Sequence, residues 1–79
     1  MTVQVKDGII KTRQMHEDGG LQFGEIPFWS MEELFHKCLY DVSPSAVERI
    51  VIRGLDAQGR PRTVTLSLQA ITKPDGRLV

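Results

Sequence analysis

The sequence contains few of the residues that carry catalytic or metal chemistry. Among 79 residues there are one cysteine, Cys38, and two histidines, His16 and His36. A single cysteine excludes an intramolecular disulfide, and a zinc site needs three or four ligands at suitable spacings. His36 and Cys38 are two positions apart in a segment expected to be helical, so their side chains point in different directions. The sequence therefore predicts no metal site and no cofactor.

Catalytic and phosphate-binding motifs are also lacking. Gly19-Gly20 is not followed by Lys and Ser or Thr, so it does not form a phosphate-binding loop. Cys38 lies in an apolar stripe, where a cysteine packs as a small hydrophobic residue, and no base that would activate it is near in sequence. Glu32 and Glu33 are about 100° apart around a helix and do not form a carboxylate pair. We therefore expect a non-enzymatic protein with no catalytic residues and no small-molecule substrate.

No apolar run approaches the roughly 20 residues that cross a bilayer, and the N-terminal residues show no basic region followed by an apolar stretch. The sequence therefore predicts a cytoplasmic protein without membrane contact. Its apolar fraction of 41% and charged fraction of 25% are ordinary for a folded protein. A chain of this length forms one small domain, which we assign to residues 1–79, and it buries only about 60% of its unfolded surface.

What the sequence does contain is a clear β-hairpin between Arg49 and Ile71. Apolar residues alternate strictly with polar ones after Arg62, which is the period of a strand with one buried face. Asp56–Pro61 supplies the turn between the two apolar runs. The apolar set is Val64, Leu66, Leu68 and Ala70, and the polar set is Thr63, Thr65, Ser67 and Gln69.

The N-terminal third predicts three further strands. Thr2–Lys6 alternates and is β-branched, and Asp7-Gly8 is a strong two-residue hairpin sequence. Ile9–Met15 would return as the second strand. His16–Gly20 is a turn, and Leu21–Ile26 alternates again as the third strand.

One helix is predicted to follow Pro27. Ser30 and Glu33 have the spacing of a capping box, in which the Ser30 hydroxyl accepts from the Glu33 amide and the Glu33 side chain returns to Ser30. Trp29 and Leu34 have the spacing of a hydrophobic staple. Pro44 disfavours helix at the residue before it, so the helix should end near Asp41 or Val42. Its apolar stripe is Met31, Leu34, Phe35, Cys38, Leu39 and Val42.

These elements predict an α+β domain in the order β-β-β-α-β-β. An antiparallel sheet of about five strands would pack against one main helix. The same elements would also allow the sheet to curl into a small barrel closed by the helix. Residues 72–79 contain turn residues and are expected to be a frayed tail.

Charge is unevenly distributed although the formal net charge is zero. Residues 16–48 carry a balance of −6 and residues 49–62 a balance of +3. Such a separation steers association with a charged partner. The basic side comes from the hairpin, where Arg49, Arg53, Arg60 and Arg62 are expected to form one cationic face with Thr63, Thr65 and Ser67.

We therefore expect a small interaction module, acting as a regulator, inhibitor or accessory protein. It would dock another protein through the arginine face or through an open strand edge, and homodimerisation through such an edge is one expected outcome. Phe28 and Trp29 would add an aromatic anchor at the corner before the helix. The alternative is a nucleic-acid-binding protein that uses the arginines as phosphate contacts, although no aromatic residue for base stacking lies between Arg49 and Val79.

Overall fold

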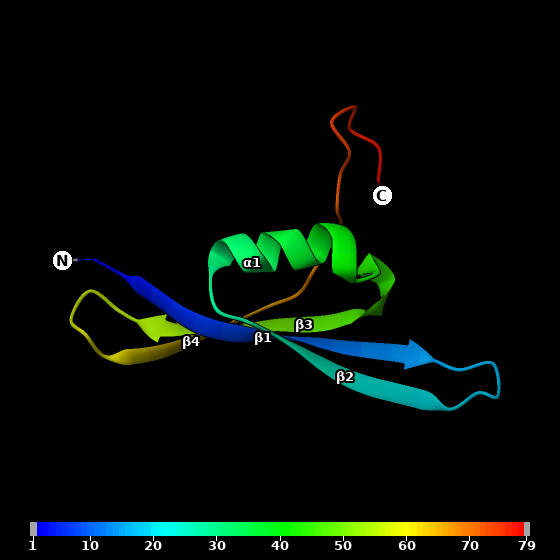
Figure 1. Cartoon of the computed structure of the whole chain (residues 1–79), viewed down its shortest axis with the longest axis horizontal. Coiled ribbons are helices and arrows are strands. Elements are labelled where there is room, and N and C mark those ends of the chain that lie inside the picture. The colour runs from blue at the N-terminus through cyan, green and yellow to red at the C-terminus, as the bar shows by residue number, and fades with distance from the viewer. Residues whose placement is uncertain (1, 79) are drawn as a thin grey trace.

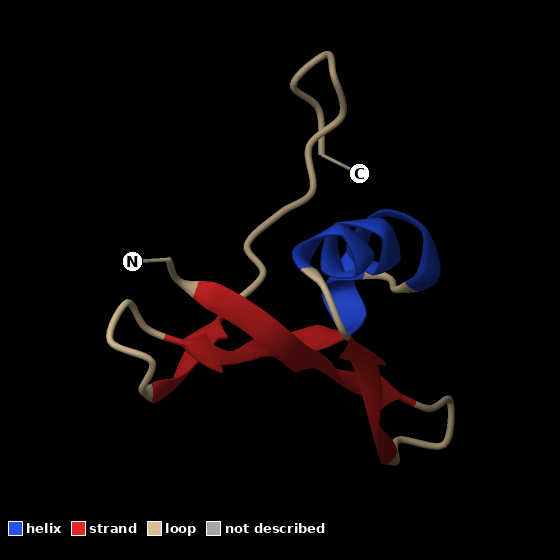
Figure 2. Ribbon diagram, turned by 60° about the vertical axis from the view of Figure 1, so that its left-hand side comes forward, coloured by secondary structure: helices blue, strands red, loops and turns tan. Residues whose placement is uncertain are grey.

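The computed structural model of the chain describes residues 2–78. It shows a four-stranded antiparallel sheet in the order β2-β1-β3-β4, with one helical segment against one face (Figures 1 and 2). The expected α+β class is thus confirmed, with four strands in an open sheet rather than five, and with edges at β2 and β4. The elements are β1 (Gln4–Met15), β2 (Leu21–Phe28), α1 (Met31–His36), β3 (Val47–Leu55) and β4 (Pro61–Leu66).

The sheet has one strand fewer than predicted because Asp7-Gly8 is not a hairpin turn but lies within β1. β1 runs straight through it, with a local irregularity between Val5 and Asp7 where it pairs with β3. Gly8 faces Phe28 on one neighbouring strand, and a Cβ at Gly8 would overlap the Phe28 ring and the Val51 carbonyl oxygen. The prediction of a turn at Asp7-Gly8 was wrong because this glycine serves close packing of an aromatic ring.

The sheet is made of two hairpins that are strongly offset. The β1–β2 loop and the β3–β4 loop lie at opposite ends of the molecule (Figure 1). All four strands pair side by side in only three rows, which contain Gly8, Ile9 and Ile10 of β1. Outside these rows the sheet narrows, and the end of the β1–β2 hairpin is a two-stranded ribbon.

The core is small and lies between the helix and the rows of Gly8 and Ile10. Ile10 and Phe28 are fully buried, and Leu34 and Ile50 join them in one cluster. Because Ile50 contacts this cluster, alternation places Ile52 of β3 and its neighbours on β4 on the same, helix-covered side. The opposite face of the sheet, which we call the open face, is not covered by any residue from 2 to 78.

The helix begins as the capping residues predict. The Ser30 Oγ accepts from the Glu33 amide at 3.0 Å, while the Glu33 carboxylate accepts from the Trp29 amide at 3.4 Å rather than returning to Ser30. α1 continues as a turn of π-helix at Lys37–Asp41, so the helical segment ends where Pro44 requires. A short 3₁₀ turn at Pro44–Ala46 then leads into β3. No helix in the described part of the chain is long and apolar enough to span a membrane.

The molecule is thin and elongated for its size. Its principal extents are 49 × 34 × 16 Å and its Cα radius of gyration is 14.5 Å, whereas a compact chain of this length has about 12 Å. Part of this elongation comes from the C-terminal segment, which projects from the body (Figures 1 and 2). There, Thr72 pairs with Leu78 across a turn at residues 73–77.

Candidate interaction surface

The four hairpin arginines do not form one face. Arg49 and Arg53 lie on the open face, because Ile50 and Ile52 beside them point toward the helix. Arg62 is paired with Gly54, which continues the series of Ile50 and Ile52 and therefore places Arg62 on the helix-covered side. The structure thus separates Arg49 and Arg53 from Arg62, and the cationic surface expected from the sequence is divided between two faces.

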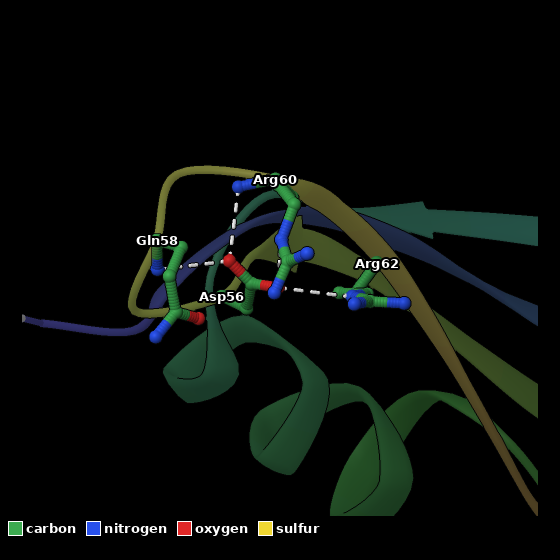
Figure 3. Close-up of polar contacts among 4 residues, drawn as sticks. All are labelled: Asp56, Gln58, Arg60 and Arg62. Carbon is green, nitrogen blue, oxygen red and sulfur yellow. Dashed lines mark hydrogen bonds and ion pairs between the residues drawn. The ribbon is translucent and has the colours of Figure 1, made fainter.

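The arginines near the β3–β4 turn are held by Asp56 (Figure 3). The Asp56 carboxylate accepts from the Arg60 and Gln58 amides at 2.9 Å each and from the Arg62 Nε at 3.0 Å. The Arg60 Nε lies 3.4 Å from the same carboxylate. The hydrogen bond from the Arg60 amide, followed by that from the Arg62 side chain, lowers the pKa of Asp56 below its ordinary value. Asp56 therefore fixes the turn and contacts both arginines, although its single charge balances only one of them.

On the open face, Arg53 is also engaged. Its Nε donates to the Asp7 carboxylate at 2.7 Å, which joins β3 to the neighbouring β1. Arg49 is the one hairpin arginine without a carboxylate within ion-pair distance among residues 2–78. Three of the four predicted cations are thus committed to contacts within the chain.

Phe28 and Trp29, which were expected to form one aromatic corner, differ in exposure. Phe28 has an exposed fraction of 0% and fills the centre of the core, so it is inaccessible to a partner in this structure. Trp29 is 63% exposed at the start of the helix and remains accessible. Only Trp29 can therefore contribute to a surface.

The clearest exposed apolar feature is β4, which forms one edge of the sheet. All six of its residues are exposed, and Val64 and Leu66, on the helix-covered side, are 51% and 45% exposed. Residues 63–72 carry no charge. Natural edge strands are usually protected by charges, prolines or bulges, and β4 has only Pro61 and Arg62, both at its beginning.

The backbone of β4 has free hydrogen-bonding groups on its outer side. The turn is closed by a bond from the Asp56 amide to the Arg60 carbonyl oxygen at 2.9 Å. Bonded and non-bonded pairs alternate along an antiparallel ladder. Counting from Arg60 along the register, the even-numbered residues of β4 bond to β3, while Thr63 and Thr65 direct their backbone groups outward. Pro61 falls in the outward series, where its missing N–H breaks no bond.

An apolar groove lies beside β4, between the helix and the segment that follows β4. It has a volume of about 350 Å³. Ile50 lines the groove, and Leu66 is the cross-strand neighbour of Ile50, so the groove and the exposed edge are adjacent. We call the groove and the exposed side of β4 together the apolar edge. Its exposed side chains are Met31, Phe35, Leu39, Val64 and Leu66.

A second exposed apolar group lies on the two-stranded end of the β1–β2 hairpin. Met15 pairs with Leu21 and Arg13 pairs with Phe23, so all four side chains lie on the open face, and the three apolar ones are exposed. We call Met15, Leu21 and Phe23 the hairpin-tip patch. The alternation of Leu21 and Phe23 indicated that they share a side, but an exposed patch was not predicted from the sequence.

No group of three or more His, Cys, Asp or Glu side chains able to hold a metal occurs between residues 2 and 78. Cys38 is half-buried against the core, and burial raises the pKa of its thiol. His36 is exposed, with its Nδ1 4.0 Å from the Asp41 carboxylate. A raised thiol pKa lowers the fraction of reactive thiolate, so Cys38 is suited to packing.

Comparison with known proteins gives no match: no family model matches the sequence, and neither the curated proteins nor the solved structures contain a match to the chain. Function must therefore be inferred from the surface itself.

Proposed function

We propose that this protein is a small non-enzymatic interaction module that binds another protein chain along the apolar edge. The partner would add a strand to β4 and cover the apolar side chains that flank it. The module would act in the cytoplasm as a regulator, inhibitor or accessory protein, as the sequence indicates.

The observation that carries this proposal is the exposed apolar edge at Val64 and Leu66, on a chain that exposes more surface in total than a compact monomer. The chain exposes 6062 Å² for a mass of 8.9 kDa. A compact monomer of this mass exposes about 4,800 Å². Exposed apolar surface next to free backbone donors and acceptors is the combination that strand addition uses.

The arginine face, the other docking surface expected from the sequence, is supported less well. Arg53, Arg60 and Arg62 each contact a carboxylate of the chain itself. A partner that engaged them would have to replace these contacts. The apolar edge requires no such exchange.

Site-specific photo-crosslinking in the native host tests the proposal. A benzophenone amino acid replaces Thr63 on the outer edge of β4, and Tyr40, an exposed aromatic on the helix outside the groove, is the matched control position. We expect a discrete protein adduct from position 63 and none from position 40. The adduct should disappear when Val64 and Leu66 are both changed to serine. Identical products from the two positions would contradict the proposal.

Nucleic-acid binding remains a second candidate because of one observation on the open face. Phe23, an exposed aromatic of the kind on which bases stack, lies opposite Arg13 and near Lys11 and Arg49. Glu25 and Glu48 border the same area, and Glu25 is 3.9 Å from Lys11.

Fluorescence titration with a labelled single-stranded oligonucleotide tests this candidate. Binding should weaken steeply with salt, and changing Phe23 to Ala should lower affinity about tenfold, since stacking on one aromatic contributes about 1–3 kcal/mol. Retained affinity in the Phe23→Ala protein would exclude this surface.

A further inference from the structure

We propose that the partner at the apolar edge is a second copy of this chain, with the two β4 strands paired antiparallel about a two-fold axis into one eight-stranded sheet. This inference rests on the proposed function and names its partner. The dimer would be isologous, because the same edge serves both copies.

The exposed area is of the size that a dimer would cover. The accessible surface of 6062 Å² exceeds that of a compact monomer by about 1,250 Å². A stable interface buries about 800 Å² on each partner. The projecting C-terminal segment accounts for part of the excess, and the half-exposed Val64 and Leu66 lie in the rest. One interface between two copies would bring the chain close to the exposure of ordinary folded proteins.

The sequence of β4 is complementary to itself in an antiparallel arrangement. With Thr65 on the two-fold axis, Val64 of one copy lies opposite Leu66 of the other, and Thr63 lies opposite Ser67. Apolar side chains then meet on the helix-covered side and hydroxyl side chains meet on the open face. Cross-strand pairs of both kinds stabilise sheets. The outward backbone groups of Thr63 and Thr65 would supply the new ladder.

Charge presents no obstacle to this pairing. The chain has a formal net charge of zero, so two copies do not repel as a whole. Asp56 balances one of the two charges of Arg60 and Arg62 within each copy, and these arginines lie at the end of the hairpin, outside the central pairs. The residues of the central pairs, 63 to 67, are uncharged.

The other edge of the sheet is less suited to self-association. β2 carries Glu25 and Pro27 in its outward series, and two copies paired there would bring carboxylates together and lack a donor at each proline. β4 is thus the edge on which we place the dimer.

Sedimentation equilibrium of the purified chain tests the proposal, with two matched proline variants. Thr65→Pro removes an outward backbone N–H of β4, and Glu25→Pro removes an outward backbone N–H of β2. Neither of these N–H groups donates to a neighbouring strand within one copy. We expect the wild type and Glu25→Pro to show twice the 8.9 kDa mass of the chain at micromolar concentration. Thr65→Pro should weaken association at least about tenfold, since two symmetry-related hydrogen bonds are lost.

A second variant covers the case in which Thr65→Pro does not fold. Thr65→Lys retains the backbone donor and places like charges together at the two-fold axis, and circular dichroism verifies its fold. It should also be monomeric. A wild type that is monomeric throughout overturns the dimer, as does a wild-type dimer that persists in both folded Thr65 variants. In either case a crosslinked adduct at position 63 with a different protein would leave the proposed function standing, and the absence of any adduct would remove both.

Discussion

Gly8 lies in one of the three rows in which all four strands pair, and its missing side chain makes room for Phe28. Among residues 2–78, five hydrophobic residues are buried, so the packing around one ring determines a large part of the stability. At this position the Phe28 ring and the Val51 backbone oxygen both occupy the space of a Cβ.

Gly8→Ala is therefore expected to destabilise the protein by about 1–3 kcal/mol, the usual effect of an extra methyl group in a packed core. Urea unfolding at fixed protein concentration measures the change. Gly24→Ala is the matched control on the neighbouring strand, since its Cβ would meet only the Thr12 Oγ1, at 2.7 Å, on a side chain that can move. Equal losses in the two variants would show that Gly8 has no special packing role.

The same residue shows where sequence reasoning failed. Asp-Gly predicts a turn from local conformational preference. Here the packing of the Phe28 ring against Gly8 determines the conformation instead. Phe28 is 20 residues away in sequence, and local patterns carry no information on such a contact. The division of the arginine face was partly predictable. The alternation of Val64 and Leu66 already implied that Arg62 shares their side of the sheet.

At the scale of elements, one turn geometry recurs three times. The turns at residues 16–20, 56–60 and 73–77 each have two backbone hydrogen bonds of the same pattern. In each, the fourth residue is a glycine with a positive φ: Gly19 at 86°, Gly59 at 79° and Gly76 at 88°. Only glycine adopts this conformation without steric cost.

The turn at 56–60 is further held by a carboxylate, which makes its stability depend on pH. Because the pKa of Asp56 is lowered in the folded chain, its contribution is present above the unfolded-state pKa, near 3.8, and is lost as pH falls through the lower folded-state pKa. Asp56→Asn should thus lower the melting temperature at neutral pH. The difference from wild type should shrink below pH 3.8. Thermal melts of both proteins across this range measure it, and a difference that does not change with pH would rule out the charge as its cause.

The elements that the sequence predicted best are those with local chemistry. The C-terminal hairpin follows from alternation and turn residues, although its second strand ends at Leu66 rather than continuing to Ile71. The helix start follows from Ser30 and Glu33. An open strand edge was expected, but the exposed apolar side chains on it were not predicted. Alternation places Val64 and Leu66 on the core side without showing that the helix leaves them half-exposed.

At the scale of the whole molecule, the thin body and projecting end predict how the chain tolerates truncation. Ending the chain after Thr72 removes the terminal hairpin and should cost less than about 1 kcal/mol. Ending it after Ser67 also removes Leu68, which packs against the core, and should cost about 2 kcal/mol or more. Urea unfolding of the two truncated proteins at one concentration distinguishes these outcomes. A large loss from the shorter deletion would mean that the terminal hairpin supports the sheet.

The offset between the two hairpins could not be predicted from the sequence. Each hairpin is specified by its own turn and alternation, whereas their relative position depends on which of several apolar residues meet across β1 and β3. A composition ordinary for a compact domain thus yields an elongated one.

The three rows in which all four strands meet are also expected to set the order of folding. Hairpins close through local contacts, which form in about 1–10 μs. Their union requires long-range pairing of β1 with β3 and the burial of Phe28, and such non-local contacts form slowly. We therefore expect these rows to be the kinetic bottleneck. Changes at Gly8, Ile10 or Ile50 should slow the formation of the native sheet, while changes at the distant loops should chiefly alter how readily each hairpin opens and closes.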